Sequence, residues 1–322
     1  MKRGQFVVSL DFELHWGVRD HTTVKQYREN LLGARAAIPA ILARFAQREI
    51  HATWATVGLL FARTRQEALS HAPRRRPAYA VTQLDPYPEL ERAGASEEDD
   101  PFHFAGTLVQ AIGNSPHQEL GTHTFSHYYC LEPGPSLGDF EADLASAKAI
   151  GAPSGDVLRS IVFPRNQFDD AHLDAFRRAG GVAFRGNPSA WYWQPHAGDR
   201  ETPAMRAFRF TDAYLPNRLP ELAGPRRHPS GLVDVPATRF LRPWTPTFAH
   251  LEALKLHRLR TEMTRAARRG GLFHLWWHPH NFGRYPVQNL AMLDRILDVF
   301  DQLRHQEGMV SLTMAESAAT VA

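Results

Sequence analysis

The chain has 322 residues, enough for one large α/β domain or two smaller ones with a substantial buried core. Its formal net charge of +3 is small for this length, so we expect no nucleic-acid partner. A single cysteine, Cys130, excludes an internal disulfide framework. No stretch approaches the roughly 18 apolar residues of a membrane span, and the first apolar run is too short for a signal peptide. We therefore expect a cytoplasmic protein without an integral membrane segment.

The first predicted elements form a βαβ unit. The apolar run at residues 6–10 predicts a strand buried on both faces of a parallel sheet. Residues 24–48 carry apolar side chains at helical spacing, and Pro39 is expected to kink or divide this helix. Residues 51–61 predict a second strand followed by the start of another element.

Two long stretches interrupt the alternation of strands and helices. The stretch at about 63–115 is rich in proline, arginine and acidic residues, and the one at about 187–230 contains aromatic residues that could line a substrate cleft. Further helices are predicted at 140–150, 170–179, 248–269 and 290–305, and further strands at 161–163, 182–185, 232–235, 272–277 and 309–312. The pattern predicts a single α/β barrel-like domain over residues 1–322, with both stretches as insertions.

An acidic pair, Asp11 and Glu13, follows the first apolar run. Because the two residues are two positions apart in extended chain, their side chains point to the same side. The carboxyl end of a strand is where α/β barrels place their sites. Either carboxylate could instead cap the next helix or form a salt bridge.

A histidine pair, His123 and His127, is four residues apart and would share one face of a helical turn. Two histidines and a carboxylate can hold Zn²⁺ while leaving a position open for water. Among 17 histidines such a pair can also arise for structural reasons.

A third histidine, His278, ends an apolar strand, and Pro279 stops regular pairing there. A histidine at a strand tip can act as a general acid toward a leaving amine. It could also be a core histidine bonded to a backbone carbonyl, and His274 and His280 are rival candidates. Alternation along the strand places His274, Trp276 and His278 on one face.

Arg165 and Asn166 also follow a predicted strand. The arginine could keep Asp11 ionised and oriented, while Asn166 or a local backbone N–H could stabilise an oxyanion. A surface ion pair is the alternative for Arg165. Asp234, at the end of another strand, could orient a histidine or be purely structural.

Taken together, these motifs resemble the polysaccharide deacetylase (NodB homology) superfamily, carbohydrate esterase family 4. The matching segments occur in the same order over nearly the whole chain: SLDFE at 9–13, HTFSH at 123–127, FPR at 163–165 and HP at 278–279. The longer segments SLDFELHWG, FPRNQ and HPHNFG are most similar to a subgroup associated with O-antigen and other surface-polysaccharide biosynthesis.

The resemblance implies a distorted (β/α) barrel of about seven strands and a divalent metal, usually zinc. The implied metal ligands are Glu13, His123 and His127. Two departures from the family pattern stand out: Phe12 occupies the second position of the first motif, and FPRNQ lacks the tyrosine that usually follows its proline.

The resemblance also implies catalytic roles. Asp11 would be the base that activates water, His278 the acid, and Arg165 the partner that orients Asp11. Substrate contacts are assigned to three residues next to these motifs: Asn166, Trp277 and His280.

The sequence thus predicts hydrolysis of an N-acetyl or similar acyl group on a sugar of a bacterial surface polysaccharide or its precursor. A cytoplasmic protein would act on a nucleotide-linked or lipid-linked precursor. Two alternatives remain: an amidase or deformylase acting on another small amide, and a catalytically silent carbohydrate- or metal-binding homologue. The sequence gives no indication of the oligomeric state.

Overall fold

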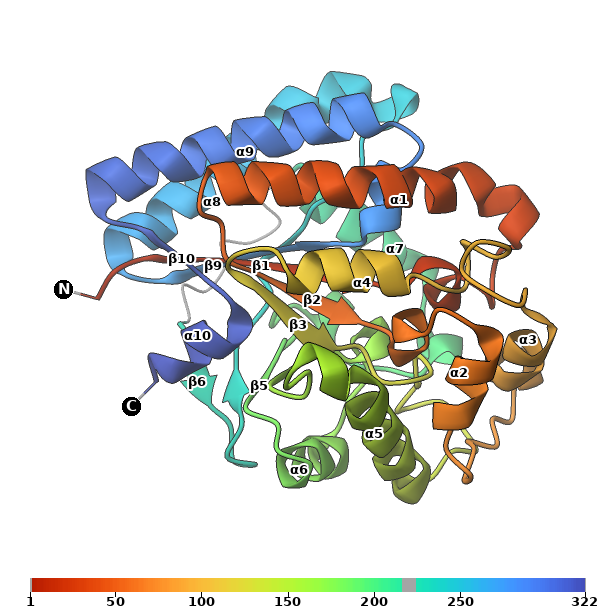
Figure 1. Cartoon of the computed structure of the whole chain (residues 1–322). Coiled ribbons are helices and arrows are strands. Elements are labelled where there is room, and N and C mark those ends of the chain that lie inside the picture. The colour runs from red at the N-terminus through yellow and green to blue at the C-terminus, as the bar shows by residue number, and fades with distance from the viewer. Residues whose placement is uncertain (1, 216–223, 322) are drawn as a thin grey trace.

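The computed structural model describes residues 2–215 and 224–321, so part of the second predicted insertion lies outside the described residues. Within them, ten strands form one sheet (Figure 1). The strands are β1 Gln5–Phe12, β2 Ala52–Thr56, β3 Gln118–Thr122, β4 Ser160–Ile161, β5 Ala183–Phe184, β6 Arg226–Arg227, β7 Val233–Asp234, β8 Arg239–Phe240, β9 Leu272–Trp277 and β10 Val310–Leu312.

The sheet curls into a barrel, and the short segment between β7 and β8 joins the two ends of its series of parallel strands. The series runs β7-β5-β4-β3-β2-β1-β9-β8, with β6 antiparallel on β7 and β10 parallel on β1. Only residues 235–238 separate β7 from β8. There Ala237 N donates to Gly186 O at 2.8 Å and Thr238 N donates to His274 O at 2.9 Å, which links the two ends. The predicted α/β barrel is confirmed.

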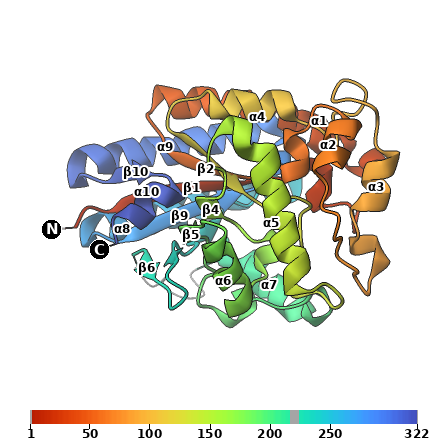
Figure 2. The same cartoon turned by 60° about the horizontal axis from the view of Figure 1, so that its bottom comes forward.

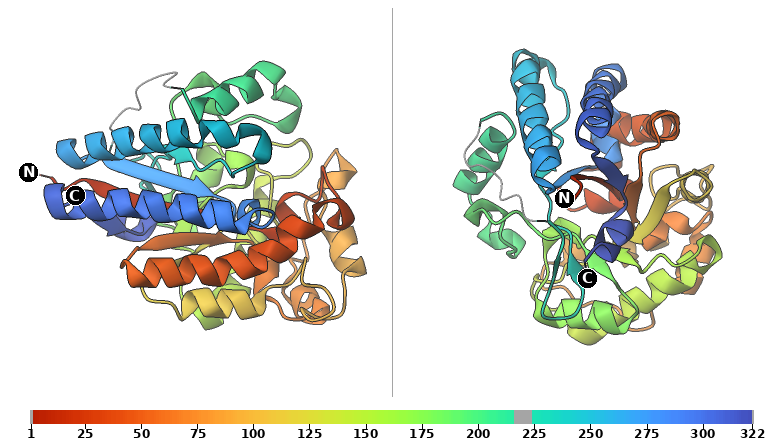
Figure 3. Two further views of the ribbon diagram at one scale, coloured as in Figure 1. Left: turned by 90° about the horizontal axis from the view of Figure 1, so that it is seen from above. Right: turned by 90° about the vertical axis from the view of Figure 1, so that its left-hand side faces the viewer.

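Helices surround this barrel (Figure 3, right). They are α1 Val24–Gln47, α2 Arg65–His71, α3 Tyr87–Arg92, α4 Gly106–Gly113, α5 Leu137–Gly151, α6 Asp170–Arg178, α7 Pro203–Asp212, α8 Glu252–Arg269, α9 Pro286–Glu307 and α10 Met314–Ala319. Turning the molecule brings α5 and α6 forward (Figure 2). No described helix has both the length and the apolar character needed to cross a membrane.

Two apolar layers hold the barrel together. Small residues fill its interior, including Val7, Ala55, Val162 and Ala183, and Met314 of α10 packs against them. The larger side chains of the strands and helices form the outer layer. Because strand residues alternate between these layers, small interior residues leave room for polar side chains at the ends of the strands.

The first helix differs from its prediction. Pro39 was expected to kink or divide it, but α1 continues through Pro39 as one helix. Its start is fixed by a capping box, in which the Thr23 hydroxyl accepts from Gln26 N and the Gln26 side chain accepts from Thr23 N. Apolar residues such as Ile38 and Phe45 bury one side of α1 in the outer layer, and this packing offsets the hydrogen bond lost at Pro39.

The predicted insertions contain more regular structure than expected. The stretch 63–115 includes α2, α3 and α4, and α4 directly precedes β3 as a helix of the barrel surround. In the second stretch, Asp212 of α7 joins a buried ion cluster in which Arg239 Nη1 donates to its Oδ2 at 2.6 Å and Arg258 Nη2 to its Oδ1 at 3.1 Å. This cluster fixes α7 onto β8 and α8.

Candidate active site

Parallel register brings the functional side chains to one rim. Five residues on neighbouring strands are register partners and form one line across the sheet: Phe12, Thr56, Thr122, Ile161 and Phe184. Glu13, His123 and Arg185 each follow this line by one residue. Neighbouring residues at one level of a parallel sheet point to the same side, so these three side chains converge. Because Leu10 pairs with Trp277, His278 lies at the level of Asp11.

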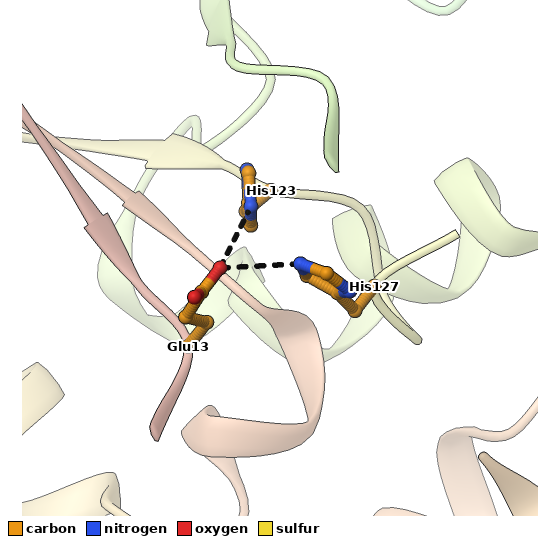
Figure 4. Close-up of side chains that lie close together, drawn as sticks. All are labelled: Glu13, His123 and His127. Atoms are coloured by element: carbon orange, nitrogen blue, oxygen red, sulfur yellow. Dashed lines mark hydrogen bonds and ion pairs between the residues drawn. The ribbon is translucent and has the colours of Figure 1, made fainter. Parts of the chain in front are cut away.

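The predicted metal ligands meet at this rim (Figure 4). Glu13 Oε2 lies 3.2 Å from His123 Nε2 and 3.1 Å from His127 Nε2. All three residues are buried. One ligand atom from each lies within 4.8 Å of the others, which is close enough for a single ion. The structure therefore brings together the triad predicted from sequence.

The loop that carries the histidines is not the helical turn considered from sequence. Thr124 and His127 have φ angles of 63° and 58°, in the left-handed region. Asp143 of α5 holds this loop: its carboxylate accepts from Phe125 N at 2.6 Å, from Ser126 N at 3.1 Å and from the Ser126 hydroxyl. The loop conformation, rather than helical spacing, aims both rings at Glu13.

The triad has the donor chemistry of a zinc site. His123 Nδ1 donates to Val162 O at 2.7 Å, which leaves the Nε2 lone pair facing Glu13. Burial lowers the pKa of His127 to about 4, so its ring is neutral at pH 7 and able to ligate. Burial raises the pKa of Glu13, but His278, His123 and His127 outweigh it and hold that pKa well below its usual value.

Gly17 makes room for the Glu13 carboxylate. A Cβ at this position would lie 2.0 Å from Glu13 Cδ and 2.1 Å from Oε1. The turn after β1 therefore forms a backbone cradle for the carboxylate, because Gly17 has no side chain to occupy that space. This cradle, the fixed His123 tautomer and the two-nitrogen, one-oxygen donor set fit a divalent metal such as zinc.

The partner of Asp11 differs from the prediction. Arg185, directly after β5, donates to both carboxylate oxygens of Asp11, Nη1 to Oδ1 at 2.6 Å and Nη2 to Oδ2 at 2.7 Å. It also donates to Ser9 Oγ at 3.0 Å and to Asn166 Oδ1 at 3.1 Å. Burial raises the pKa of Asp11, but Arg185 outweighs it and keeps the pKa below its usual value.

Arg165 does not pair with Asp11. It bonds Asp20, and its Nη1 donates to Glu132 Oε1 at 3.2 Å. Its guanidinium lies 4.4 Å from the Tyr129 ring centroid. The chain turns after Pro164 with a φ of 53° at Arg165, which directs this side chain outward along the rim instead of toward β1.

His278 lies beside both carboxylates. Its Nε2 is 3.7 Å from Asp11 Oδ2 and 3.6 Å from Glu13 Oε1. Asn281 Nδ2 lies 3.3 Å from His278 Nδ1. Nδ1 therefore faces Asn281, and Nε2 is the nitrogen that faces the carboxylates.

The two rival histidines are both buried. His274 Nδ1 lies 3.1 Å from Val235 O and its Nε2 lies 2.8 Å from Ser9 Oγ, below the rim. Burial lowers the pKa of His274 to about 3. His280 lies behind Glu13, with Nδ1 3.9 Å from Glu13 Oε1, and burial also lowers its pKa to about 3. Neither side chain lines the cavity above the rim.

Strand alternation also corrects one predicted substrate contact. Trp277 is fully buried and packs between Phe45 and Phe282 in the outer layer. Its neighbour Trp276 faces the barrel interior, where Arg185 lies 4.2 Å from its ring centroid. Trp276, rather than Trp277, therefore faces the cavity, in agreement with the period of two in a strand. Asp234, which could have oriented a histidine, instead accepts from Arg226 Nε at 3.0 Å.

A cavity of about 970 Å³ opens above the rim. Residues of the rim line its base: Asp11, Glu13, His123, His127, Asn166, Trp276 and His278. Residues of the second insertion line one side: Trp193, Gln194, His196, Gly198, Glu201, Arg206 and Arg209. The expectation that this insertion lines a cleft is confirmed through Trp193. Trp191, by contrast, is more than half exposed and packs on Phe208.

No protein-family model matches the chain, and no curated protein matches it in sequence. Among solved structures, a Mycobacterium smegmatis protein described as a polysaccharide deacetylase superposes with a TM-score of 0.61 and 11% identity, over 99% of this chain and 90% of that chain. The chain shares the fold of a polysaccharide deacetylase.

The same fold matches two enzymes with other names. The GH57-type branching enzyme from Pyrococcus horikoshii superposes with a TM-score of 0.56 and 11% identity, over 97% of this chain and 69% of that chain. The α-amylase AmyC from Thermotoga maritima superposes with a TM-score of 0.55 and 10% identity, over 99% of this chain and 75% of that chain. Because the names of these proteins describe different reactions, the side chains of the site, and not the fold, must indicate the function.

Two residues that support the site were not predicted from sequence. Arg185 is the last residue of the strand predicted at 182–185. A charged side chain at the end of a buried strand was the signal that could have indicated its role. Asp143 was placed within a predicted helix, where nothing local distinguishes it from a surface carboxylate. Only the packing of α5 against the histidine loop reveals its contacts.

Proposed function

We propose that the chain is a zinc-dependent hydrolase that removes an N-acetyl or similar acyl group from a sugar of a bacterial surface polysaccharide, such as O-antigen, or its precursor. The observation that carries this proposal is the grouping of Asp11 and His278 around Glu13, His123 and His127 at the base of one cavity. A base, an acid and a metal-ligand set are the three parts that metal-assisted amide hydrolysis requires.

Glu13, His123 and His127 would hold the metal. A bound zinc ion lowers the pKa of water toward 7 and polarises an acyl oxygen. The protein's contribution is the fixed arrangement of the ligands: Val162 O orients His123, and the turn at Gly17 leaves space for the Glu13 carboxylate. The described residues offer three protein ligands here, so a coordination position would remain for water or substrate.

Asp11 is the proposed general base. Its two bonds to Arg185 fix the plane of the carboxylate, and Arg185 is itself held by Ser9 and Asn166. Since its pKa lies below the usual value, the carboxylate is ionised at neutral pH and able to accept a proton from water. Arg185 is a positioning residue in this scheme because it acts through Asp11.

His278 is the proposed general acid. Its Nε2 faces the same space as the two carboxylates and the side chain lines the cavity. A proton on Nε2 would pass to the amine nitrogen as the carbon–nitrogen bond breaks. Asn166 also lines the cavity, and its Oδ1 accepts from Arg185, so its amide nitrogen is the atom that can donate to a substrate oxygen.

The cavity supports a sugar substrate that carries negative charge. Trp193 and Trp276 offer aromatic rings for the apolar face of a sugar, and Arg206 adds positive charge on the side of Trp193. Arg209 on that side is paired with Glu201 at 2.7 Å. These features are the support for a nucleotide-linked or lipid-linked precursor, whose diphosphate would meet Arg206. A cytoplasmic enzyme would meet such precursors, and this location is part of the proposal.

The decisive variant is Asp11→Asn. It should lower turnover of an N-acetylated sugar nucleotide by on the order of 10²- to 10⁴-fold, because the general base is lost, while bound zinc is retained. Asp174→Asn, on the exposed face of α6, is the matched control and should leave turnover unchanged. An Asp11→Asn enzyme with full activity would contradict the assignment.

A substrate panel separates the proposed reaction from its alternatives. Acetate release from N-acetylated sugar nucleotides or lipid-linked sugars, abolished by chelation and by His123→Ala with His127→Ala, supports the proposal. Release of formate from N-formyl amides alone would favour the deformylase alternative. Binding of sugar without product would favour a silent homologue, and cleavage of α-glucans would assign the site to glycosyl chemistry.

A further inference from the structure

A second cluster of histidines and a carboxylate lies outside the catalytic rim. His15 follows β1 in the 3₁₀ turn Leu14–Gly17, Glu89 belongs to α3, and His103 precedes α4. His15 Nδ1 and His103 Nε2 lie 2.7 and 2.9 Å from the same oxygen, Glu89 Oε1. The two ring nitrogens are 3.2 Å apart. One ligand atom from each residue lies within 4.8 Å of the others.

The outer nitrogens of both rings are held by oxygen acceptors. His103 Nδ1 lies 2.8 Å from Asp100 Oδ2, and His15 Nε2 lies 3.3 Å from Thr22 O. Each acceptor needs an N–H from the ring it faces. When each ring gives its one N–H to these acceptors, the inner nitrogens can offer their lone pairs to an ion between the rings and Glu89. A carboxylate or carbonyl behind each histidine is the arrangement that orients metal-binding rings.

The space between the three side chains suits a divalent cation. The two inner nitrogens lie 3.2 Å apart and 2.7 and 2.9 Å from Glu89 Oε1, so a single ion would accept a lone pair from each ring and from Glu89.

The burial of the cluster suits a bound ion with a route of entry. His15 and His103 are buried, whereas the Glu89 side chain is 27% exposed. The Trp16 indole N–H also donates to His103 O at 2.8 Å, so the turn after β1 and the segment before α4 are already joined. None of the three ligand residues lines the catalytic cavity.

We propose that His15, Glu89 and His103 bind a second divalent metal ion, zinc, as a structural site separate from the catalytic triad. The ion ties three segments together: the turn that continues from Glu13, helix α3, and the chain entering α4. Nitrogen, nitrogen and oxygen ligands suit zinc, and the exposed side of Glu89 leaves space for water to complete the coordination.

The test is zinc stoichiometry in the wild type and three variants, measured by titration of chelator-treated protein and by mass spectrometry. The wild type should bind two ions per chain. The His123→Ala, His127→Ala variant should bind one, and Glu89→Gln should also bind one. Glu91→Gln is the matched control on the same helix α3, where the Glu91 carboxylate pairs with Arg76, and it should bind two.

Thermal unfolding gives a readout independent of catalysis. In the His123→Ala, His127→Ala variant, zinc at a hundredfold excess over Kd should raise the midpoint by about 5 °C, and adding Glu89→Gln should remove this shift. Anomalous diffraction from zinc-loaded wild-type crystals needs no variant and should show a peak between His15, Glu89 and His103.

Other zinc stoichiometries would contradict one of the two metal sites. One ion per wild-type chain, lost entirely in the His123→Ala, His127→Ala variant, would overturn the second site and leave the proposed function intact. Two ions in Glu89→Gln would overturn it as well. One ion in the wild type that is lost in Glu89→Gln but retained in the double variant would support this site and count against the catalytic metal.

Discussion

The base and the side wall of the cavity are built differently. The base includes Asp11, Glu13, His123 and His278, which lie at the ends of parallel strands or directly after them, and Arg185 supports it by pairing with Asp11. Its Arg185–Asp11 pair is almost fully buried, with side chains 1% and 4% exposed. The wall consists of Arg165 and the insertion residues 193–209, and Arg165 is 31% exposed.

We expect this difference to separate the proposed chemistry, at the base, from substrate specificity, in the wall. Register fixes the relative heights of the base residues, so their geometry depends on the whole sheet. The wall is held by separate contacts, such as the 2.7 Å bond from Gly198 N to Glu132 Oε1 and the 2.6 Å bond from Arg209 Nε to Tyr192 O. Loop contacts of this kind can vary while the scaffold stays constant. We expect changes at the base to affect folding and catalysis, and changes in the wall to affect substrate binding.

The largest expected difference is between two arginines. Arg185→Met should lower the free energy of unfolding by about 3–5 kcal/mol, because it leaves the buried Asp11 carboxylate without its partner. Arg165→Met is the matched change in the wall and should cost about 1 kcal/mol, since Arg165 is partly exposed. Urea unfolding measures both. Equal losses would remove the distinction between base and wall.

The histidine loop of the base should give a pH-dependent effect through Asp143. Burial raises its pKa to about 6, despite the hydrogen bonds from Phe125 and Ser126. Because the pKa of Asp143 is higher in the folded state than in the unfolded chain, the stabilisation of the fold by the protonated carboxyl is complete below about pH 4. It is lost as the pH rises through 6. The stability difference between wild type and Asp143→Asn should therefore fall by about 2–3 kcal/mol from pH 4 to pH 7. A difference independent of pH would contradict this expectation.

Gly17→Ala tests the cradle of Glu13. The added Cβ would overlap the Glu13 carboxylate, so the zinc concentration for half-maximal turnover should rise by about 10- to 100-fold. Gly224→Ala is the control, because a Cβ there would have no described atom within 4 Å beyond its chain neighbours. Unchanged zinc dependence in Gly17→Ala would show that the turn can move without displacing the ligand.

The smallest expected effect lies in the wall. Trp193→Ala should raise KM by about fivefold, equivalent to about 1 kcal/mol, and leave kcat unchanged, because the ring lines the wall of the cavity and we expect it to contact substrate away from the reacting atoms. Trp191→Ala is the control, since this ring does not line the cavity. A large fall in kcat for Trp193→Ala would assign the wall a part in the chemistry.

Local pattern was sufficient for much of the fold. The apolar run at 272–277 predicted β9 with the same bounds, and residues 24–48 predicted α1 to within one residue. The short strand β8 was missed because its two residues, Arg239 and Phe240, carry no apolar run. β8 is a strand because its backbone pairs with β9, which its own sequence does not indicate.

The same contrast holds for the site. Asp11, Glu13, His123, His127 and His278 were predicted from sequence because each stands beside a recognisable strand end or motif, and the structure brings them to one cavity. Arg165 was predicted to orient Asp11, but the structure places Arg185 against Asp11. Arg185 was predicted as the last residue of a strand, and local sequence does not show that its side chain turns toward Asp11.

The second cluster shows a further limit. His15 lies within the segment SLDFELHWG, but its partners fall in a stretch assigned to an insertion. Glu89 and His103 are each ordinary in their local context. Only the folding of α3 against the turn after β1 brings all three side chains together.

By itself, the sequence determined the alternation of strands and helices and the residues at several strand ends, because periodicity and chain-breaking residues act locally. The tertiary structure decided which partners meet: Arg185 with Asp11, Asp143 with the histidine loop, and His15 with Glu89 and His103. These pairs join residues far apart in the chain, and their contact depends on sheet register and helix packing, which no local pattern contains.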